Sequence, residues 1–461
     1  MHDRLIGSLL LVLSLAVAAA EWTDARDLYL AAGGGVALAV VLLLPTVPKA
    51  RWPFPAVAAG LALWALIGRE GGAALVETAL LSAGFIAGFF VALAWLRSAA
   101  AGSAAIARCG QFLADQPPGR RYAALTAGGH LFALVLSYGA ISLLGGLAEA
   151  SARREPNREI AEIRVRRMLL AIQRGFTATL PWSPLAFAMA VTLTLVPGAT
   201  WSAAAPWCVV TAALMIGLGW AVDTIVKPKL AGPRPEPRRA EGGWGRLKPL
   251  LLLLAVIVGT VGLLQAASGL GAIPVIMVAV PAISLGWIAL QARAAPEGAG
   301  AHLAGRLARF VGVELPGYRS EIVLLTTAGF IGTLGSALLA PLIAGLGLDL
   351  AALPGWALLL AVMWLIPIGG QVGMNPILAV SLIAPLLPPA QALGVSPAAV
   401  VVAITAGWAL SGVTSPYTAT TLLVGSFGHV SARRVGLVWN GFYVAVTVAA
   451  LSAWVVFVAT R

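Results

Sequence analysis

The stretch SPAAVVVAITAGWALSGVTSPYTATTLLVG, residues 396–425, decides how this chain folds. It carries no charged side chain and belongs to a longer uncharged run from Leu350 to Phe427. A helix needs about 20 apolar residues to cross the hydrocarbon core of a bilayer. This stretch exceeds that length, and Ser415-Pro416 interrupts it, because proline lacks an N–H and clashes with the preceding turn. We therefore expect a membrane helix that is broken near its middle.

The composition extends this expectation to the whole chain. Of 461 residues, 60% are apolar and 10% are charged, and the mean hydropathy is +0.92. A soluble domain is about 25% charged, and a membrane β-barrel would alternate polar and apolar residues in segments of about ten. The sequence therefore predicts an all-α polytopic membrane protein and excludes a cytosolic enzyme, a nucleic-acid binder and a secreted disulfide scaffold. Cys109 and Cys208 form no disulfide framework.

The apolar runs predict eleven transmembrane helices and two re-entrant hairpins. The spans are 5–20, 28–44, 54–67, 73–96, 165–197, 201–222, 249–266, 272–290, 322–346, 396–425 and 435–460, and the hairpins are 122–147 and 355–388. The first span also resembles a cleavable signal peptide, because Met1–Arg4 precedes an apolar run that ends in Ala18-Ala19-Ala20. We expect it to remain as an uncleaved helix, because further membrane helices follow it at once.

The basic residues fix the predicted orientation. Cytoplasmic loops of membrane proteins carry an excess of Lys and Arg. With the N-terminus in the cytoplasm, 27 of the 30 basic residues lie on that side, and Arg26, Arg69 and Arg461 lie outside with the C-terminus. This balance also supports the hairpins, because a full crossing at either one would move every later loop to the other side. The basic cytoplasmic loops therefore account for the net charge of +12, as is typical of an inner-membrane protein.

An internal repeat divides the chain into an N-terminal helix (1–27), a first repeat (28–222), a basic cytoplasmic linker (223–248) and a second repeat (249–461). Each repeat holds five spans, an odd number, so the two copies have opposite orientations, as in many secondary transporters. The matching residues are Gly84-Phe85-Ile86 with Gly329-Phe330-Ile331, Gly128-Gly129-His130 with Gly369-Gly370-Gln371, Gly175 with Gly407, and Ser183-Pro184 with Ser415-Pro416.

Two spans, 165–197 and 396–425, are too long for one straight crossing, and each contains a Ser-Pro. A break near the bilayer midplane exposes backbone N–H groups that favour an anion and C=O groups that favour a cation such as sodium. The candidate binding residues at the two breaks are Ser183, Pro184, Thr414, Ser415, Pro416 and Thr418. The alternative for each is a plain proline kink whose hydroxyls bond back to their own helix.

The hairpin tips supply the other candidates. Gly370, Gln371, Gly373 and Asn375 form the second tip, where glycine lets backbone approach a ligand and the two amides supply donors and acceptors. A simple buried turn is the alternative. The sodium ion of a symporter would lie near Ser183, Asn375 and Ser415.

The first hairpin has two candidate tips. The repeat places its tip at Gly128-Gly129-His130, whereas equal arm lengths place it at Ser137-Tyr138-Gly139. Ser137 is therefore a candidate site residue. His130 is another, as a proton carrier or, in the alternative, as a packing residue.

Acidic residues are nearly absent from the deep membrane positions, which disfavours a pump built on buried carboxylates. Arg174 lies about two and a half turns before Ser183. It could face the cavity as a counter-charge for an anion. We favour the alternative, an interfacial arginine whose head group extends to the cytoplasm.

With these features the chain resembles the ion-transporter superfamily, which includes divalent anion/sodium symporters, citrate–metal symporters and arsenite permeases. The resemblance is one of layout: a leading helix, two inverted five-span repeats, a hairpin opening to each side and a broken helix in each repeat. Dicarboxylate symporters carry Ser-Asn-Thr at both hairpin tips, whereas this chain has Gln371 to Asn375 at one tip and no Asn at the other. The resemblance implies a homodimer in which hairpins and broken helices move as an elevator against a scaffold that includes 73–96 and 322–346.

The sequence thus predicts an ion-coupled secondary active transporter for a small anionic solute, a carboxylate or an oxyanion, with Na⁺ or H⁺ as the coupling ion. It predicts no enzymatic activity, no cofactor and no nucleic-acid partner. The alternative is a cation/proton antiporter or toxic-oxyanion exporter of the same fold. A membrane-embedded enzyme or a channel is the third hypothesis, and the sequence has no His-Glu-x-x-His, no Gly-x-Ser-x-Gly and no nucleotide-binding loop in its favour.

Overall fold

The computed structural model describes residues 2–226, 243–293, 298–345 and 350–461. These residues form helices joined by turns and loops, and none of them lies in a β-strand. Ten of the helical segments are long and apolar enough to cross a membrane. The predicted all-α polytopic fold is therefore confirmed. Most of the predicted linker, residues 227–242, lies outside the described residues.

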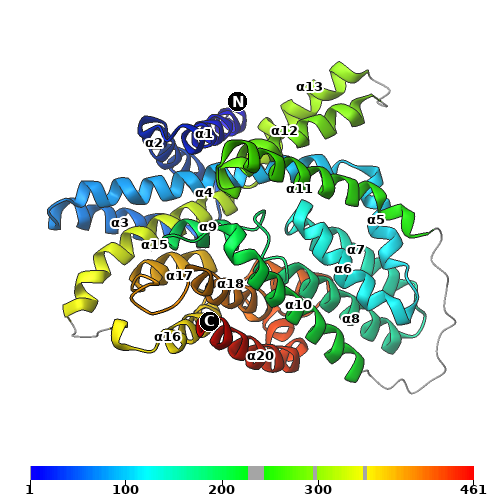
Figure 1. The fold of residues 1–461 in the computed structure, drawn as a ribbon. Coiled ribbons are helices and arrows are strands. Elements are labelled where there is room, and N and C mark those ends of the chain that lie inside the picture. The colour runs from blue at the N-terminus through cyan, green and yellow to red at the C-terminus, as the bar shows by residue number, and fades with distance from the viewer. Residues whose placement is uncertain (1, 227–242, 294–297, 346–349) are drawn as a thin grey trace. The chain divides into compact units, whose positions relative to one another are not determined.

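The chain divides into two compact units, and the first unit comprises Met1–Ala99, Val256–Leu350 and Ile377–Pro388. Within it, α1 packs along α2, and α15 packs against α2 and α3 (Figure 1). Its helices are α1 (His2–Thr23), α2 (Arg26–Leu43), α3 (Pro53–Gly68), most of α4 (Gly72–Ala101), the second part of α11 (Lys248–Ser268), α12 (Ala272–Ala292), α13 (Ala299–Arg309), α14 (Leu315–Gly317), α15 (Arg319–Gly345) and α17 (Pro376–Ile383).

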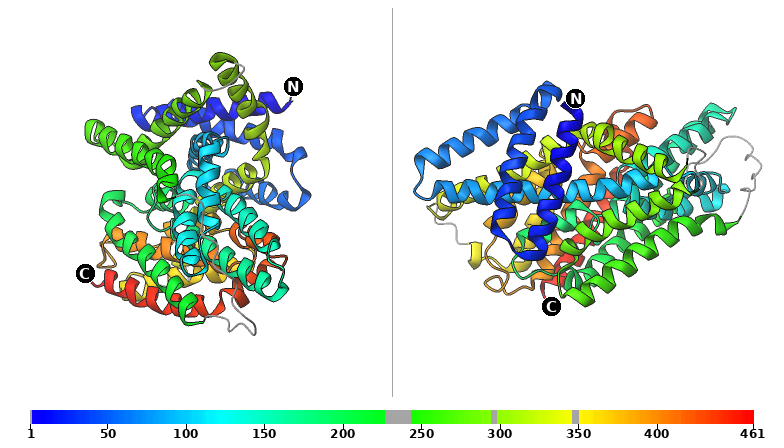
Figure 2. Two further views of the ribbon diagram at one scale, coloured as in Figure 1. Left: turned by 90° about the vertical axis from the view of Figure 1, so that its right-hand side faces the viewer. Right: turned by 90° about the horizontal axis from the view of Figure 1, so that it is seen from above.

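The second unit comprises Ala100–Ala255, Ala351–Pro376 and Pro389–Arg461. Two helix pairs dominate it, α6 on α8 and α16 on α18, and α20 packs against α10, α16 and α18 (Figure 2). Its helices are α5 (Ala104–Ala114), α6 (Pro118–Leu136), α7 (Gly139–Arg153), α8 (Arg158–Thr177), α9 (Phe187–Leu195), α10 (Trp201–Ile225), α16 (Gly355–Gln371), α18 (Pro397–Thr414), α19 (Ala419–Phe427) and α20 (Gly441–Ala459), with a 3₁₀ turn η3 (Trp244–Leu247) and a π-helix η7 (Arg434–Trp439).

Both long spans are broken where the sequence places the Ser-Pro pairs. The span predicted at 396–425 consists of α18 and α19, separated by residues 415–418. The span predicted at 165–197 is not one membrane helix but α8 and α9, separated by residues 178–186. This segment contains Pro181 and Pro184, which both remove a helix donor. Neither α8 nor α9 is among the ten candidate spans, and each of those ten corresponds to one of the other ten predicted spans.

The first hairpin consists of α6 and α7, which pack together in the second unit. Its turn lies at Ser137 and Tyr138, and Ser137 has a positive φ of 50°. Equal arm lengths therefore located this tip correctly. The tip suggested by the repeat, Gly128-Gly129-His130, was wrong, because these residues lie inside α6.

In the second hairpin, α16 ends at Gln371, and residues 372–375 are not helical. Gly373 at this tip has a φ of 92°, a conformation that glycine adopts without strain. The two arms divide between the units, with α16 in the second unit and nearly all of α17 in the first. The predicted boundaries of this hairpin, 355–388, agree with the two helices.

Glycines let each broken helix lie directly on a hairpin arm. A Cβ atom on Gly175 of α8 would lie 2.1 Å from the carbonyl oxygen of Thr126 in α6. A Cβ atom on Gly407 of α18 would lie 2.6 Å from the carbonyl oxygen of Met363 in α16. The two contacts are equivalent, because each joins the first part of a broken helix to the first arm of a hairpin. The glycines that matched in the sequence therefore serve the same packing role.

The short helix α5 packs on α6, α7 and η3 with its apolar face. Cys109 on this face is buried, and its Sγ lies 2.9 Å from the carbonyl oxygen of Arg246, to which it donates. Burial raises the pKa of the Cys109 thiol, so the thiolate is disfavoured at neutral pH.

We expect Cys109 to react with maleimide at least tenfold more slowly at pH 7 than an exposed thiol, because the thiolate is the nucleophile. The measurement is the rate of labelling of the intact protein, with Cys208→Ala removing the other thiol. Ala104→Cys, an exposed position on the same helix, is the matched control in a Cys109→Ala, Cys208→Ala background. Equal labelling rates for the two thiols would contradict the buried position of Cys109.

Candidate functional site

The two Ser-Pro breaks share one local geometry. The Ser183 Oγ accepts a hydrogen bond from the N–H of Leu185 at 3.2 Å, and the Ser415 Oγ accepts from the N–H of Tyr417 at 3.2 Å. Each serine N–H also donates to the carbonyl oxygen four residues earlier, from Ser183 to Thr179 at 3.0 Å and from Ser415 to Ser411 at 2.9 Å. Both serines are at most 1% exposed. Each serine hydroxyl thus stabilises its own break. This local bond is one that a plain proline kink would also make.

At the second break, Ser415 also reaches the hairpin. Its hydroxyl donates to the carbonyl oxygen of Gly370 on α16 at 2.6 Å. The buried Oγ of Ser411, one turn earlier, has no hydrogen-bond partner among the described residues. A Cβ atom on Gly370 would lie 2.6 Å from this oxygen. The hairpin arm and the break thus enclose a buried hydroxyl that has no hydrogen-bond partner among the described residues.

Three threonines cap the carbonyl groups that the second break frees. Thr418 and Thr421 donate from their Oγ1 atoms to the carbonyl oxygen of Ser415, at 3.0 and 2.5 Å. Thr420 donates to the carbonyl oxygen of Gly412. The Thr414 hydroxyl instead bonds back to Leu410 at 2.9 Å. Of the two predicted threonines, Thr418 therefore belongs to the break, whereas Thr414 is bonded within its own helix.

His130 lies beside the first break, although it is not a hairpin tip. Its Nδ1 is 3.2 Å from the carbonyl oxygen of Gly175, and its Nε2 is 3.2 Å from the Nε1 of Trp182. Because indole can only donate, Nε2 accepts and Nδ1 carries the proton. The two rings are stacked, and Trp182 also accepts at its carbonyl oxygen from the indole of Trp201 at 2.8 Å. The neutral ring of His130 is thus fully bonded.

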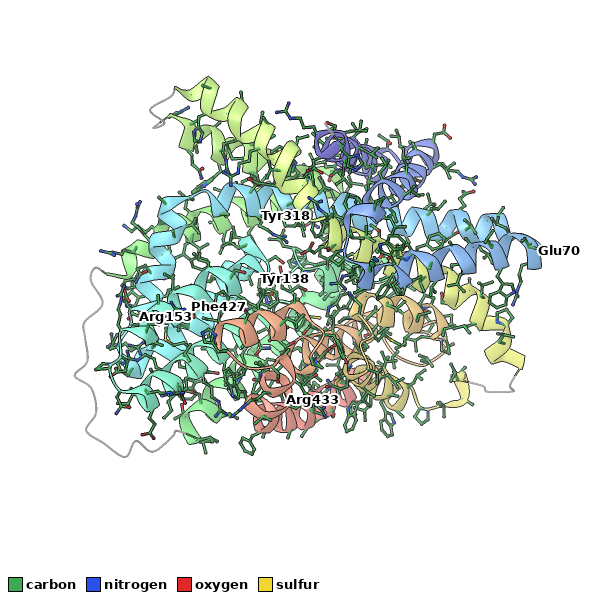
Figure 3. All side chains as sticks on the ribbon, turned by 180° about the vertical axis from the view of Figure 1, so that it is seen from behind. Glu70, Tyr138, Arg153, Tyr318, Phe427 and Arg433 are labelled. Carbon is green, nitrogen blue, oxygen red and sulfur yellow. The ribbon has the colours of Figure 1, made fainter. Side chains whose placement is uncertain are left out.

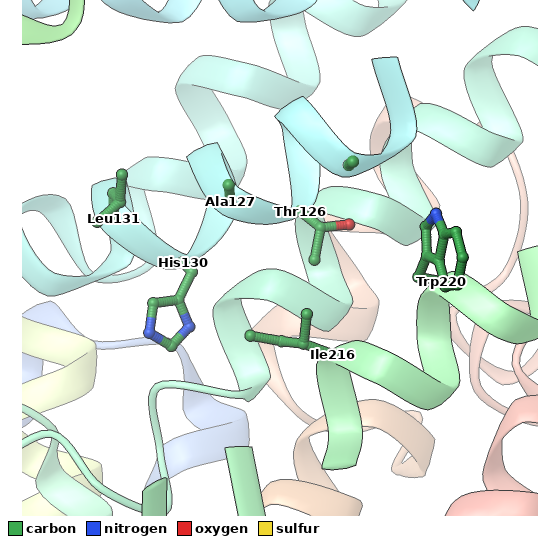
Figure 4. A pocket seen from close by; sticks show the side chains of 7 residues that line it. Thr126, Ala127, His130, Leu131, Ile216 and Trp220 are labelled. Carbon is green, nitrogen blue, oxygen red and sulfur yellow. The ribbon is translucent and has the colours of Figure 1, made fainter. Parts of the chain in front are cut away.

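A pocket of about 350 Å³ opens next to His130 between α6 and α10 (Figure 4). It is almost entirely apolar, with Thr126 and His130 as its polar residues. The lining residues are Ala123, Thr126, Ala127, His130, Leu131, Ile216 and Trp220.

Aromatic contacts bring each hairpin tip to a break. Tyr138 at the first tip, labelled in Figure 3, stacks on Phe176 at the end of α8, with the ring centroids 5.2 Å apart. At the second tip, a Cβ atom on Gly373 would lie 3.9 Å from the ring of Tyr417. These contacts place Ser137 and Gly373 next to the first and second breaks respectively.

The amides of the second tip lie on either side of Gly373. Gln371 is half-buried, and its Nε2 donates to the carbonyl oxygen of Pro367 at 3.4 Å. Asn375 lies in the non-helical segment immediately before Pro376 and is half-buried. No cluster of three or more His, Cys, Asp or Glu side chains occurs in the described parts of the chain. A cation at this tip would therefore need hydroxyl, amide and carbonyl oxygens.

The residue that sequence reasoning placed wrongly is Arg174. We favoured an interfacial arginine, but its side chain is only 3% exposed. Its Nε donates to Asn440 Oδ1 at 3.1 Å and its Nη1 to the Tyr122 hydroxyl at 3.0 Å, and its guanidinium carbon lies 4.2 Å from the ring centre of Tyr443. Asn440 then donates to Gln173 Oε1 at 2.9 Å. Burial overrides the tendency of arginine to extend to the interface because these neutral groups receive its N–H donors.

The two broken helices cross near this cluster. Gln173 Nε2 lies 3.5 Å from the carbonyl oxygen of Val413, to which it donates. A Cβ atom on Gly412 would lie 3.3 Å from both Thr177 and Leu180. Gln173, Asn440 and Tyr122 were missed because a single amide or phenol in an apolar run carries no recognisable pattern. The only signal was the polar pair Gln173-Arg174 inside a predicted span.

Comparison with known proteins identifies the architecture. No protein-family model matches the sequence, and no curated protein matches it. Among solved structures, the YdaH transporter of Alcanivorax borkumensis aligns with a TM-score of 0.56 at 17% identity, covering 89% of this chain and 99% of that one. MtrF of Neisseria gonorrhoeae, described as an antimetabolite efflux pump, aligns with a TM-score of 0.53 at 15% identity, covering 90% and 96%. The chain has a transporter fold.

This likeness confirms the coarse part of the predicted resemblance, a multi-pass membrane protein with the fold of known transporters. At 17% and 15% identity it concerns the fold alone. The chain covers nearly the whole length of both structures, 99% of YdaH and 96% of MtrF.

Proposed function

We propose that the chain is an ion-coupled secondary active transporter that moves a small anionic solute, a carboxylate or an oxyanion, by alternating access. The observation that carries this proposal is the pair of Ser-Pro breaks with one hydrogen-bond geometry, each next to a hairpin tip. Irregular backbone within a membrane persists only where protein or a water-filled cavity covers it. Broken helices in two repeats are where secondary transporters bind their solutes.

The binding residues would be those that the breaks and tips bring together. Ser415 joins the second break to Gly370, and the unpartnered hydroxyl of Ser411 adds a donor that can bond an anion. Ser183 occupies the equivalent position at the first break. In one version of the proposal the coupling ion is sodium, bound by oxygens of Ser183, Asn375 and Ser415. In the other version it is a proton.

The division into units supports an elevator mechanism of the kind seen in the ion-transporter superfamily. The hairpin α6–α7, both broken helices and α16 belong to the second unit, whereas nearly all of α4 and the whole of α15 belong to the first. In the proposed mechanism the second unit carries the solute, and the first forms the scaffold and the interface of a homodimer. The equivalent contacts of Gly175 and Gly407 support two inverted repeats, 28–222 and 249–461.

We place the protein in the inner membrane, with its N-terminus in the cytoplasm and its C-terminus outside. This orientation rests on the 27 basic residues that it assigns to the cytoplasm, of the 30 in the chain. The lipid bilayer and the small solute are then its partners, together with a second copy of the chain. Transport itself needs no enzymatic step or bound cofactor.

We expect Ser415→Ala to lower solute uptake at least tenfold while leaving the protein folded. The substitution removes the bond to the carbonyl oxygen of Gly370 and the acceptor for the N–H of Tyr417, so the hairpin tip loses its attachment to the break. The measurement is uptake of a radiolabelled anion into proteoliposomes, with size-exclusion chromatography to verify folding.

Ser284→Ala is the matched control, because this serine lies on α12, is 0% exposed and donates to the carbonyl oxygen of Val280 in its own helix at 2.7 Å. Wild-type uptake rates in Ser415→Ala and in Ser183→Ala would exclude both breaks as the binding site.

The second candidate function is a proton-driven exporter, either of a toxic oxyanion or, as a cation/proton antiporter, of a cation. Its favouring observation is His130 beside the first break, whose Nε2 must release the indole of Trp182 if it takes up a proton. MtrF is described as an efflux pump, which agrees with export. The discriminating test is the pH dependence of transport in His130→Gln, and an unchanged pH profile would exclude His130 as the proton carrier.

A further inference from the structure

We propose that Arg174 is the inner contact of a binding site for a carboxylate or an oxyanion, which the anion reaches past Arg166 and Arg434. The inference rests on the proposed function, because it names the charge that would select an anionic solute. It is confined to the second unit, which contains all of these residues.

The first observation is that every partner of Arg174 is neutral. Its Nε bonds to Asn440, and its Nη1 bonds to Tyr122 at 3.0 Å and to the carbonyl oxygen of Gly219 at 3.4 Å. Nη2 makes no hydrogen bond to any described residue, although only 3% of the side chain is exposed. The guanidinium therefore keeps two N–H donors for a ligand. A carboxylate that displaced the long bond to Gly219 would bind across Nη1 and Nη2, the bidentate geometry that arginine favours.

The second observation is that this buried charge lacks a counter-ion. Two other arginines of α8 are paired, Arg164 with Glu155 at 2.5 Å and Arg167 with Asp223 at 2.6 Å. In the described parts of the chain Arg174 forms no ion pair with a carboxylate. Removing a cation from water without a counter-ion costs several kcal/mol. A bound anion would offset that cost.

The carboxylate near the cluster is already neutralised. Asp223 acts electrostatically on Tyr122 but is bound by Arg167 through both carboxylate oxygens, at 2.9 and 2.6 Å. Asp223 is therefore not a free counter-ion for Arg174.

The third observation is a pair of arginines without acidic partners within the described residues, Arg166, which interacts with Arg174, and Arg434, which interacts with Arg166. Arg166 is exposed and lies over the ring of Trp439 at 5.7 Å, and its charge interacts with those of Arg174 and Arg434. Among the residues that the structure describes, neither Arg166 nor Arg434 has an acidic partner. Exposed charges of one sign that lead to a buried one raise the local concentration of the opposite ion. We take Arg166 and Arg434 as the mouth of the site.

The site adjoins the second break. Gln173, the neighbour of Arg174, donates to Val413, and a Cβ atom on Gly436 of η7 would lie 2.1 Å from the carbonyl oxygen of Thr414. An anion on Arg174 would therefore lie next to the end of α18. In the predicted orientation Arg166 and Arg434 face the cytoplasm. The site would therefore hold the solute on the cytoplasmic side of the protein.

The test measures anion binding directly. The thermal unfolding midpoint of the full chain in uncharged detergent is followed while sodium benzoate or sodium sulfate replaces sodium chloride at constant ionic strength. We expect one of these anions to raise the midpoint, with a half-saturating concentration that increases at least tenfold in Arg174→Gln. In Arg166→Gln and Arg434→Gln it should increase about threefold. Arg158→Gln is the control, because Arg158 is exposed and paired with Glu162, and it should match the wild type.

Two outcomes would overturn the proposal: no stabilisation of the wild type beyond that given by chloride, or an unchanged half-saturating concentration in Arg174→Gln. If Arg174→Gln does not fold, Arg174→Lys replaces it. A lysine keeps the charge but not the planar fork, so stabilisation should persist with a weaker affinity, and wild-type affinity would contradict the bidentate site.

The phosphate of a lipid head group is also an oxyanion that Arg174 could bind. In nanodiscs, loss of the benzoate response only with phosphatidylglycerol would show that a head group occupies Arg174, and would overturn a solute site.

Transport and binding separate the two proposals. If the wild type binds benzoate through Arg174 but carries no anion across the membrane, the anion site stands and the proposed function fails. If the wild type transports an anion and Arg174→Gln does so with the same KM, the function stands and the Arg174 site fails.

Discussion

Gly175→Ala is expected to destabilise the protein by about 3 kcal/mol or more, at the upper end of the cost of overpacking. The added methyl group would lie 2.1 Å from the carbonyl oxygen of Thr126 and 3.0 Å from the backbone nitrogen of His130. Both atoms belong to the backbone of α6, so no side-chain rotation relieves the clash. The helices α6 and α8 must separate, and the bond between Gly175 and His130 is lost with them. The unfolding midpoint in detergent, with and without the substitution, measures this effect.

Gly217→Ala on α10 is the matched control. Nothing lies within 4 Å of a Cβ atom at this position, and alanine is the better helix former by up to about 1 kcal/mol. The control should therefore unfold at the same temperature as the wild type or higher. In Gly407→Ala the added methyl group would lie 2.6 Å from the carbonyl oxygen of Met363. This variant should lose as much stability as Gly175→Ala if the two helix pairs are equivalent. A Gly175→Ala protein as stable as the control would contradict the close packing of α6 on α8.

Asn440→Leu is expected to cost about 3 kcal/mol, because it removes the centre of a buried polar cluster. Asn440 accepts from Arg174 Nε and donates to Gln173 Oε1, and it is 0% exposed. Leucine fits the volume but leaves a charged donor and an amide acceptor without partners, and each buried unpaired group costs about 1–3 kcal/mol. The unfolding midpoint again provides the measurement.

The double variant Gln173→Leu, Asn440→Leu supplies the internal control. Replacing both partners of a hydrogen bond is less costly than replacing one, so the double variant should lose less stability than the sum of the single variants. Strict additivity would contradict a direct bond between the two amides.

The fold could be predicted largely because membrane helices follow from the length of apolar runs. Ser183-Pro184 and Ser415-Pro416 predicted both breaks, since proline removes a helix donor wherever it stands. The glycine matches were less reliable. Gly128-Gly129-His130 suggested a hairpin tip, but Gly129 serves close contact with Ile172 of α8 instead. A glycine alone does not distinguish a turn from a close helix crossing.

The candidate site could be predicted only in part, because many of its contacts join side chains from different helices, and the sequence does not show which helices meet. Ser415 and Gly370 were identified from the sequence, but the bond between them joins residues far apart in the chain. For Arg174 the position near a predicted span end favoured an exposed head group. The neutral partners that allow its burial, Tyr122 and Asn440, come from α6 and the end of η7. No local pattern in the sequence connects these segments.

The most direct measurement of the central claim is anion flux into proteoliposomes under an imposed ion gradient. Purified wild-type protein would be tested with labelled benzoate, citrate and sulfate, with inward gradients of Na⁺ or H⁺ and with none. The proposed mechanism predicts uptake of one of these anions that saturates with its concentration and collapses when the gradient is dissipated. Flux that neither saturates nor depends on a gradient would indicate a channel. Absence of flux for all three anions under both gradients would contradict anion transport through the paired breaks.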